Sequence, residues 1–260
     1  MKLVSVIIPT RNRFNYLKLA IESVLLQTWK NIEIIIVDEA SSDESVEYLN
    51  HLAYKGTIIL IRNEKPTGGG NARNLGIAKA SGYYIAFLDD DDTWLPVKIE
   101  MQVNLFESSK DVSLVTCSYS NITPGSKTKI IDIFPVKNEQ ELLRGNNYGG
   151  ASMYITTKAN LNKSKGFDKS LSSGQDWDLL LKMYQIGPIL ICNSPLVNYL
   201  SHNNVRISNS FISSYKGLRD IYLKYNYKMN ASTKYRHLAE LKFYRLKLSN
   251  AITIMKFKKF

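Results

Sequence analysis

Across residues 3–89, short apolar runs rich in β-branched residues alternate with longer segments whose apolar side chains recur at helical spacing. An apolar run between turn residues is typical of a strand buried on both faces, and strands that alternate with helices are typical of a parallel, doubly wound sheet. We therefore expect an α/β fold with a mostly parallel central sheet flanked by helices. Strands are expected at 3–9, 32–38, 57–63 and 83–89, and helices at 14–28, 42–53 and 68–81.

The second half of the chain is less regular, and it contains no internal repeat. Short β-branched runs around the turn sequence TPGS predict a pair of strands, and the runs PILICN and PLVNYLS favour a second, returning pair. Strands are expected at 113–122, 129–134, 152–157, 188–193 and 195–201, and helices at 139–145 and 175–187.

Length and composition indicate a globular protein with a sizeable core. The 260 residues, 44% of them hydrophobic, suit one large α/β domain with an appendage. Cys117 and Cys192 stand in apolar surroundings without a second cysteine or histidine nearby, so we expect buried thiols, no cysteine metal site and a reducing compartment. The N-terminal apolar run is too short for a signal peptide and no 18-residue apolar stretch exists, so we expect a cytoplasmic location.

Positive charge is concentrated at the C-terminal end of the chain. The net charge is +11, and residues 215–260 contain twelve Lys or Arg against two acids, a net of +10, which leaves about +1 for the rest. A nearly neutral body with a basic tail is the expected organisation, and residues 206–260 are predicted to form a basic helical extension.

Four consecutive aspartates, Asp89 to Asp92, follow the strand expected at 83–89. Ligands of doubly wound sheets bind at the carboxyl ends of the strands, and Asp38 ends the strand expected at 32–38. Alternate residues of an extended segment face the same way, so Asp89 and Asp91 can converge on one hard cation such as Mg²⁺ or Mn²⁺. The alternative is a solvated acidic turn that caps the following helix.

Five motifs carry a resemblance to a known family: VSVIIPTRNR, IIIVDEASSDES, GNARNLGI, FLDDDDTW and GQDWDLLLKM, in this order. The chain resembles the inverting family 2 glycosyltransferases of the GT-A fold, of the type that builds bacterial surface polysaccharides, over residues 3 to about 200. The resemblance implies a catalytic domain at 1–205. Its nucleotide-binding half would span about 1–93 and its acceptor-binding half about 94–205, followed by the extension at 206–260.

The resemblance also implies a donor site. The loop after the first strand would hold the nucleotide, with Thr10 at the base and the charge of Arg13 available for phosphate, while Asp38 would bind base or ribose. The residues after Asp38 are Glu39 and Ala40, which depart from the family pattern VDDGSxD. The donor-binding residues implied are Pro9, Thr10, Arg11, Asp38, Arg73, Asp89 and Asp90.

Further roles follow from the same resemblance. Asp91 would bind the metal ion, Mg²⁺ or Mn²⁺, with His202 as a second candidate ligand, and Arg206 would lie in a loop over the diphosphate. Asp176 would be the catalytic base. The family glutamate before it is replaced by Gln175, and a helix cap is the alternative role of Asp176. Trp177 would be an acceptor platform or a packing residue.

The reaction implied is inverting transfer of a sugar from a nucleotide diphosphate, with UDP favoured, to a hydroxyl of a glycan acceptor, which we expect to be lipid-linked. One alternative is a nucleotidyltransferase that makes the sugar nucleotide; such enzymes usually carry a GxGTR-like loop where this chain has PTRNR. Another is a basic nucleic-acid-binding protein, which the nearly neutral body and the acidic strand ends disfavour.

The tail contains apolar residues that fall roughly on one helical face, namely Leu238, Leu241, Tyr244, Leu248 and Ile252. A basic amphipathic helix of this kind can lie on an anionic membrane, here the inner face of the cytoplasmic membrane. The alternative is packing on the catalytic body or in a homodimer. No nucleic-acid partner is expected.

Overall fold

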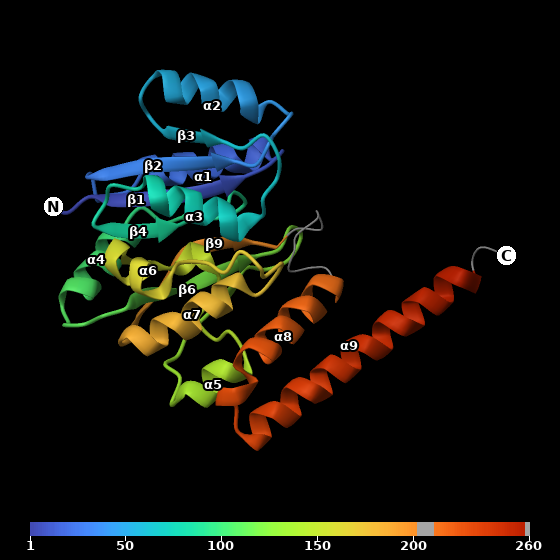
Figure 1. Cartoon of the computed structure of the whole chain (residues 1–260). Coiled ribbons are helices and arrows are strands. Elements are labelled where there is room, and N and C mark those ends of the chain that lie inside the picture. The colour runs from blue at the N-terminus through green and yellow to red at the C-terminus, as the bar shows by residue number, and fades with distance from the viewer. Residues whose placement is uncertain (202–210, 258–260) are drawn as a thin grey trace.

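The computed structural model describes residues 1–201 and 211–257, with side chains through Lys247 (Figure 1). Within these ranges one mixed sheet is flanked by helices, which confirms the α/β expectation. The strands are β1 Val4–Thr10, β2 Ile32–Asp38, β3 Ile59–Arg62, β4 Tyr84–Phe87, β5 Thr93–Trp94, β6 Leu114–Ile122, β7 Lys129–Ile131, β8 Ile155–Thr157 and β9 Ile189–Leu200. The helices are α1 Phe14–Leu25, α2 Ser45–Tyr54, α3 Gly69–Lys79, α4 Lys98–Glu107, α5 Glu139–Arg144, α6 Lys158–Ser164, α7 Gln175–Ile186, α8 Phe211–Tyr225 and α9 Ala231–Phe257, with 3-10 turns η1 Ala151–Met153 and η3 Asn226–Lys228.

The first half of the sheet is parallel, with strand order β3-β2-β1-β4. Its central strands bury Val4, Val6 and Ile7 in β1 and Ile35 and Ile36 in β2 completely. Helix coverage on both faces accounts for these continuous apolar runs, because neither face of the strands is left for water. The strands and helices predicted over residues 3–89 are confirmed, with shifts of a few residues at their ends.

Beyond β4 the sheet becomes mixed. Strand β8 pairs antiparallel with β4 and with β6, and β9 runs parallel to β6. The returning pair of strands predicted at 188–193 and 195–201 is wrong, because β9 is one strand. Its register on β6 passes from Cys117↔Cys192 to Tyr119↔Val197. The extra residues of β9 form an irregularity that contains Pro195, a residue without an N–H for the ladder.

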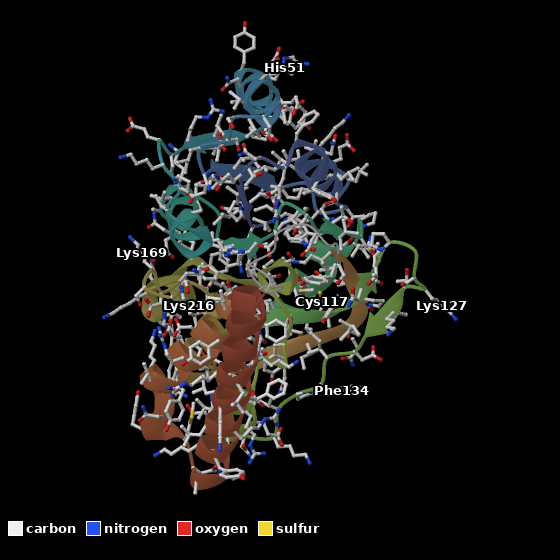
Figure 2. All side chains as sticks on the ribbon, turned by 90° about the vertical axis from the view of Figure 1, so that its right-hand side faces the viewer. His51, Cys117, Lys127, Phe134, Lys169 and Lys216 are labelled. Atoms are coloured by element: carbon white, nitrogen blue, oxygen red, sulfur yellow. The ribbon has the colours of Figure 1, made fainter. Side chains whose placement is uncertain are left out.

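A further difference concerns short elements, whereas the cysteines are as expected. Strand β5 and helix α6 were not predicted, because a strand of two residues and a helix of seven have too little sequence to show a period. Cys117 and Cys192 are both buried and unpaired, which confirms the expected thiols, and Figure 2 shows Cys117 inside the body.

The C-terminal segment is helical, as expected, and packs on the body. Helices α8 and α9 lie side by side, and α9 also contacts α5 (Figure 1). The domain boundary between 205 and 206 stays a prediction, because it falls outside the described residues. Among the helices that the structure describes, none combines the length and the apolar character needed to cross a bilayer.

Candidate active site

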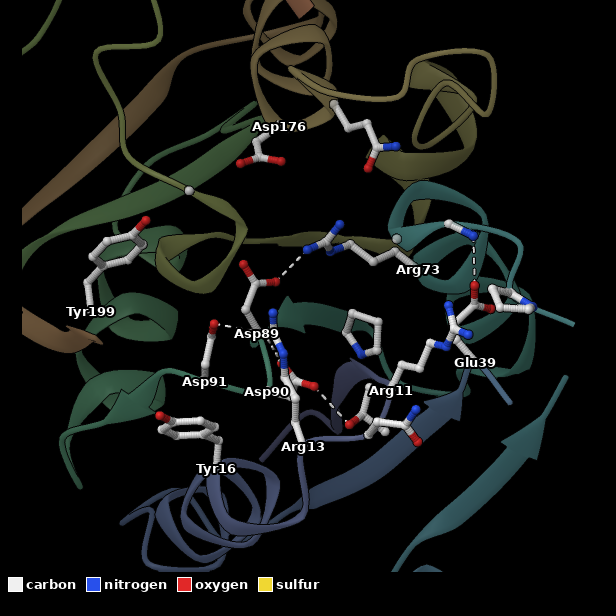
Figure 3. A pocket seen from close by; sticks show the side chains of 18 of the residues that line it. Arg11, Arg13, Tyr16, Glu39, Arg73, Asp89, Asp90, Asp91, Asp176 and Tyr199 are labelled. Atoms are coloured by element: carbon white, nitrogen blue, oxygen red, sulfur yellow. Dashed lines mark hydrogen bonds and ion pairs between the residues drawn. The ribbon is translucent and has the colours of Figure 1, made fainter. Parts of the chain in front are cut away.

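A cavity of about 1290 Å³ opens at the carboxyl ends of β1, β2 and β4. Figure 3 shows the aspartates that follow β4 in contact with arginine side chains on one side of it, with Asp176 on the opposite side. Of the residues predicted to form the site, the cavity is lined by Pro9, Thr10, Arg11, Arg73, Asp89, Asp90, Asp91 and Asp176.

The loop after β1 binds the aspartates that follow β4. Thr10 Oγ1 donates to Asp90 Oδ2 at 2.8 Å, while Arg13 Nη1 lies 2.9 Å from Asp90 Oδ1 and 2.8 Å from Asp91 Oδ2. Burial raises the pKa of Asp90 to about 6, and the charge of Asp91 adds to the increase while Arg13 and Thr10 oppose it. Arg13 therefore supplies the positive charge that makes two adjacent buried carboxylates tolerable.

Arg73 links the aspartates to the opposite side of the cavity. Its guanidinium is buried, forms an ion pair with Asp89 and lies 5.3 Å from the ring centre of Phe167. Asp89 and Asp176 both raise the pKa of Arg73 against the effect of burial. Its Nε is buried and has no hydrogen-bond partner among the described residues. A buried donor without a partner is unusual in a folded protein.

Asp176 lies in the first turn of α7, directly across from Arg73 and Asp89 (Figure 3). The chain enters this helix through Gly174, whose φ of 74° is a conformation that glycine adopts without strain. Burial is the main cause that raises the pKa of Asp176; Arg73 lowers it and Asp89 adds to the increase. A carboxylate with a raised pKa at the wall of a cavity has the properties of a general base.

Asp92, the last of the four aspartates, does not line the cavity. Its side chain is buried, accepts a hydrogen bond from Ser152 Oγ at 2.6 Å, and accepts a second from the N–H of Leu200 at 3.3 Å. Ser152 Oγ in turn accepts from the N–H of Asp89 at 3.0 Å. Asp92 thus fixes the backbone that presents the other aspartates, a role that sequence reasoning missed.

Asp38, one of the predicted donor-binding residues, does not line this cavity. Asp38 is fully buried beneath it and accepts hydrogen bonds from the Ser41 N–H at 3.0 Å and from Arg62 Nε at 2.9 Å. The next residue, Glu39, lines the cavity instead, and its carboxylate accepts from the Gly68 N–H at 2.7 Å. The donor-binding role of Asp38 stays a prediction.

Trp177 points away from the large cavity. Its Nε1 donates to the carbonyl of Leu142 at 2.7 Å, and its ring stacks on His237 of α9 at a centroid distance of 5.8 Å. This geometry agrees with the packing alternative, and it anchors the C-terminal helices. His202 and Arg206 lie outside the described residues. Sequence reasoning also missed Tyr119 and Tyr199, which line the cavity from β6 and β9.

The residues at the strand ends suit a hard divalent cation only if a bound phosphate group supplies further oxygen atoms to the ion. Among the described residues, no group of three potential ligating side chains comes together. Mg²⁺ often takes one or two carboxylates and completes its shell with phosphate oxygens and water. The buried carboxylates of Asp90 and Asp91 provide donor oxygens of the right type, so they fit such an ion.

The fold and the cavity define an α/β protein with an acidic, arginine-bearing ligand site at the carboxyl ends of parallel strands. Residues 5–168, more than half of the chain, match the family described as "Glycosyl transferase family 2". An uncharacterized glycosyltransferase of Rickettsia prowazekii is 34% identical over 216 residues, which cover 77% of this chain and 64% of that protein. The chain belongs to the glycosyl transferase family 2.

Other relatives have more specific names. The Escherichia coli protein WfaP, a UDP-Glc:alpha-D-GlcNAc-diphosphoundecaprenol beta-1,3-glucosyltransferase, is 43% identical over 121 residues, which cover 46% of each chain. The chondroitin synthase of Pasteurella multocida is 29% identical over 210 residues, which cover 80% of this chain and 22% of that protein. The chain thus spans less than two thirds of the length of these curated relatives.

Solved structures confirm the GT-A fold. Staphylococcus aureus TarS 1–349 in complex with UDP-GlcNAc has a TM-score of 0.69 at 17% identity, covering 94% of this chain and 73% of that chain. The same segment in complex with UDP has a TM-score of 0.64 at 20% identity, covering 92% and 70%.

Proposed function

We propose that this protein is an inverting glycosyltransferase that transfers a sugar from a nucleotide diphosphate, UDP favoured, to a hydroxyl of a glycan acceptor. The observation that carries the proposal is the placement of Asp176 across one cavity from Arg73 and Asp89. One wall then holds a general base with a raised pKa, and the other holds the charged groups suited to a diphosphate.

The reaction needs one base and one displacement. Asp176 takes the proton from the acceptor hydroxyl, whose oxygen attacks the anomeric carbon from the face opposite the nucleotide. The bond between the anomeric carbon and the diphosphate oxygen breaks, and the nucleoside diphosphate leaves with the bonding electrons. A single displacement inverts the anomeric configuration.

Arg73 would bind the diphosphate through its buried guanidinium, since a planar guanidinium matches phosphate oxygens bidentately. Arg11 and Arg13 lie at the same end of the cavity. Asp91 would hold Mg²⁺ or Mn²⁺, which when bound neutralises negative charge on the diphosphate.

The acceptor we propose is a lipid-linked glycan of a surface polysaccharide, with the protein at the inner face of the cytoplasmic membrane. Support comes from the name of the relative WfaP, whose acceptor is a diphosphoundecaprenol-linked sugar, and from the basic tail with a net charge of +10 over residues 215–260. An anionic surface attracts such a tail by about 1 kcal/mol for each Lys or Arg close to it.

The proposal is tested by incubating the protein with a panel of UDP-sugars, Mg²⁺ or Mn²⁺, and alkyl-diphosphate-linked mono- and disaccharides that contain N-acetylglucosamine, then analysing products by mass spectrometry. The expected result is UDP release that depends on the acceptor, with one hexose or N-acetylhexosamine added to it. Formation of a UDP-sugar from UTP and a sugar 1-phosphate would support the nucleotidyltransferase alternative, and failure to bind any UDP-sugar would overturn the proposal.

A further inference from the structure

A second, smaller cavity of about 220 Å³ lies between the start of α7 and the helices α8 and α9. It shares Ser173 and Gly174 with the large cavity, so these two residues form the boundary between the two spaces. The consecutive residues Asp176 and Trp177 project from the first turn of α7 about 100° apart. Asp176 lines the large cavity and Trp177 lines the small one.

The polar groups of the small cavity are suited to a neutral polyol. Its wall includes the hydroxyls of Ser214 and Tyr244 and the carboxylate of Glu240. In the part of the chain that the structure describes, neither of these two hydroxyls makes a hydrogen bond. The carboxylate uses Oε1 for Arg236 at 3.0 Å, which leaves Oε2 as an acceptor. Hydroxyl groups of this kind both donate to and accept from sugar hydroxyls, and a carboxylate accepts from them.

The charge of this wall is opposite to the charge of the surrounding tail. Residues 215–260 carry a net charge of +10, yet none of the residues that line the small cavity is Lys or Arg. An anionic ligand such as a diphosphate would therefore meet Glu240 rather than a cation. The aromatic rings of Trp177 and Tyr244 provide flat apolar surface for the C–H face of a sugar ring.

The shape of the cavity depends on a close approach of α8 to the start of α7. A Cβ on Gly217 would lie 3.0 Å from Ser173 Oγ and 3.1 Å from Ser173 Cβ, so glycine permits this spacing. The volume of about 220 Å³ lies below the roughly 300–1,000 Å³ of ordinary ligand pockets, so the cavity suits one sugar ring rather than a nucleotide diphosphate.

We propose that this cavity is an acceptor subsite that binds a second, uncharged sugar ring of the acceptor glycan, next to the ring whose hydroxyl faces Asp176. The inference rests on the proposed glycosyl transfer and adds to it that the acceptor has at least two sugars. The C-terminal helices then contribute directly to acceptor recognition, because Ser214 and Gly217 belong to α8, and Glu240 and Tyr244 to α9.

The test compares the wild type with the double variant Glu240→Met/Tyr244→Phe, which removes the hydrogen-bonding groups of both side chains but keeps their approximate size. The matched control is Tyr235→Phe, on the same helix, where the side chain is 77% exposed and lines neither cavity. Binding is measured at saturating UDP against an array of uncharged disaccharides of glucose, galactose and N-acetylglucosamine, in both anomeric linkages, together with the monosaccharides.

We expect the wild type to bind at least one disaccharide more tightly than either of its monosaccharides. That disaccharide should bind at least tenfold more weakly to the double variant, since the loss of two or more hydrogen bonds, one of them charged, exceeds the 1.4 kcal/mol of a tenfold change. Monosaccharide binding, UDP affinity and the Tyr235→Phe control should change less than twofold.

A best-bound disaccharide with equal affinity for the wild type and the double variant would overturn the inference, and so would a wild type that binds UDP but none of the array. UDP binding is the readout that separates the two hypotheses. A wild type that fails to bind UDP would overturn the proposed function itself, whereas normal UDP binding with unaffected disaccharides would overturn the subsite alone.

Discussion

Asp176 differs from a surface aspartate in its position at the cavity and in its pKa. It lies opposite Arg73 and Asp89, and burial raises its pKa above the ordinary value of about 3.9. The carboxylate is the active form of a base, so the rate should fall as the pH is lowered through this raised pKa. The acid limb of the pH profile should therefore lie at higher pH than an exposed aspartate would give.

The first prediction replaces Asp176 with asparagine, which is nearly isosteric but cannot take the proton. The turnover number should fall by about 10²- to 10⁴-fold, the usual effect of losing a general base, and the acid limb should disappear. UDP affinity, measured by calorimetry, should stay within twofold. A variant with normal turnover would assign the base to another group.

The second prediction concerns Asp91 and the metal ion. Chelation of divalent cations should weaken UDP binding to the wild type by at least tenfold, because an ion shared between Asp91 and the diphosphate would be lost. The variant Asp91→Asn should bind UDP weakly with or without added Mn²⁺. Calorimetry that finds tight UDP binding in chelator, unchanged by the substitution, would rule out this role of Asp91.

The third prediction concerns Asp92, which supports the site without lining it. The variant Asp92→Ala leaves the Ser152 hydroxyl and the Leu200 N–H without their acceptor, which should cost about 1–3 kcal/mol for each buried unsatisfied group. UDP affinity should fall as well, because Ser152 also bonds the backbone of Asp89. The control Asp132→Ala, at an exposed position, should change neither the unfolding free energy nor UDP affinity. Equal stability of both variants in urea would contradict the account.

At the scale of elements, α7 and α8 are joined by a buried ion network. Asp178 is fully buried; its carboxylate accepts a hydrogen bond from the Tyr225 hydroxyl at 2.7 Å and lies 2.6 Å from Lys224 Nζ and 2.7 Å from Lys182 Nζ. Lys224 also lies 2.5 Å from Asp168 and holds the pKa of that carboxyl well below its usual range. The helix that presents Asp176 is therefore bound to the C-terminal extension.

The fourth prediction is that Asp178→Asn lowers the free energy of unfolding by about 3 kcal/mol, because it removes the buried negative charge that pairs with the partly buried ammonium groups of Lys182 and Lys224. The matched control is Asp220→Asn on α8, which breaks the more exposed pair with Arg219 and should cost less than about 1 kcal/mol. Urea unfolding followed by circular dichroism measures both. Equal losses of unfolding free energy for the two substitutions would show that the network stabilises the protein no more than the exposed pair does.

At the scale of the whole molecule, α9 carries apolar side chains on two sides. Leu241 and Tyr244 face inward and are half-buried, as the packing alternative predicts. Leu238, from the same predicted face, is exposed together with Tyr235, Phe243 and Leu246. The helix therefore packs on the body and still presents apolar and basic side chains outward, a combination that suits an anionic membrane surface.

The fifth prediction tests this surface with vesicles that contain anionic phospholipid. The wild type should sediment with them at low salt and less at high salt, and Phe243→Ser/Leu246→Ser should reduce sedimentation severalfold. The control Leu19→Ser/Leu25→Ser changes exposed leucines of α1 instead and should sediment like the wild type. Equal sedimentation of all three proteins, or of none, would refute membrane binding through α9.

Local sequence determined much of this protein. The strands and helices over residues 3–89 follow from hydrophobic periodicity, which is a property of neighbouring residues. The placement of Asp89 to Asp91 at a ligand cavity follows from strand ends and from the geometry of parallel sheets.

Tertiary structure decided the contacts between residues far apart in sequence. Arg13 contacts Asp90 and Asp91, which lie 77 and 78 residues further along the chain. Asp92 meets Ser152 and Leu200, and Trp177 meets His237, only because the sheet and the C-terminal helices bring them together. The periodicity of a segment specifies which face it buries but not which distant side chain covers that face. Three features therefore appear only once the chain has packed. They are the irregularity at Pro195, the burial of Asp38 against Arg62 and the second cavity.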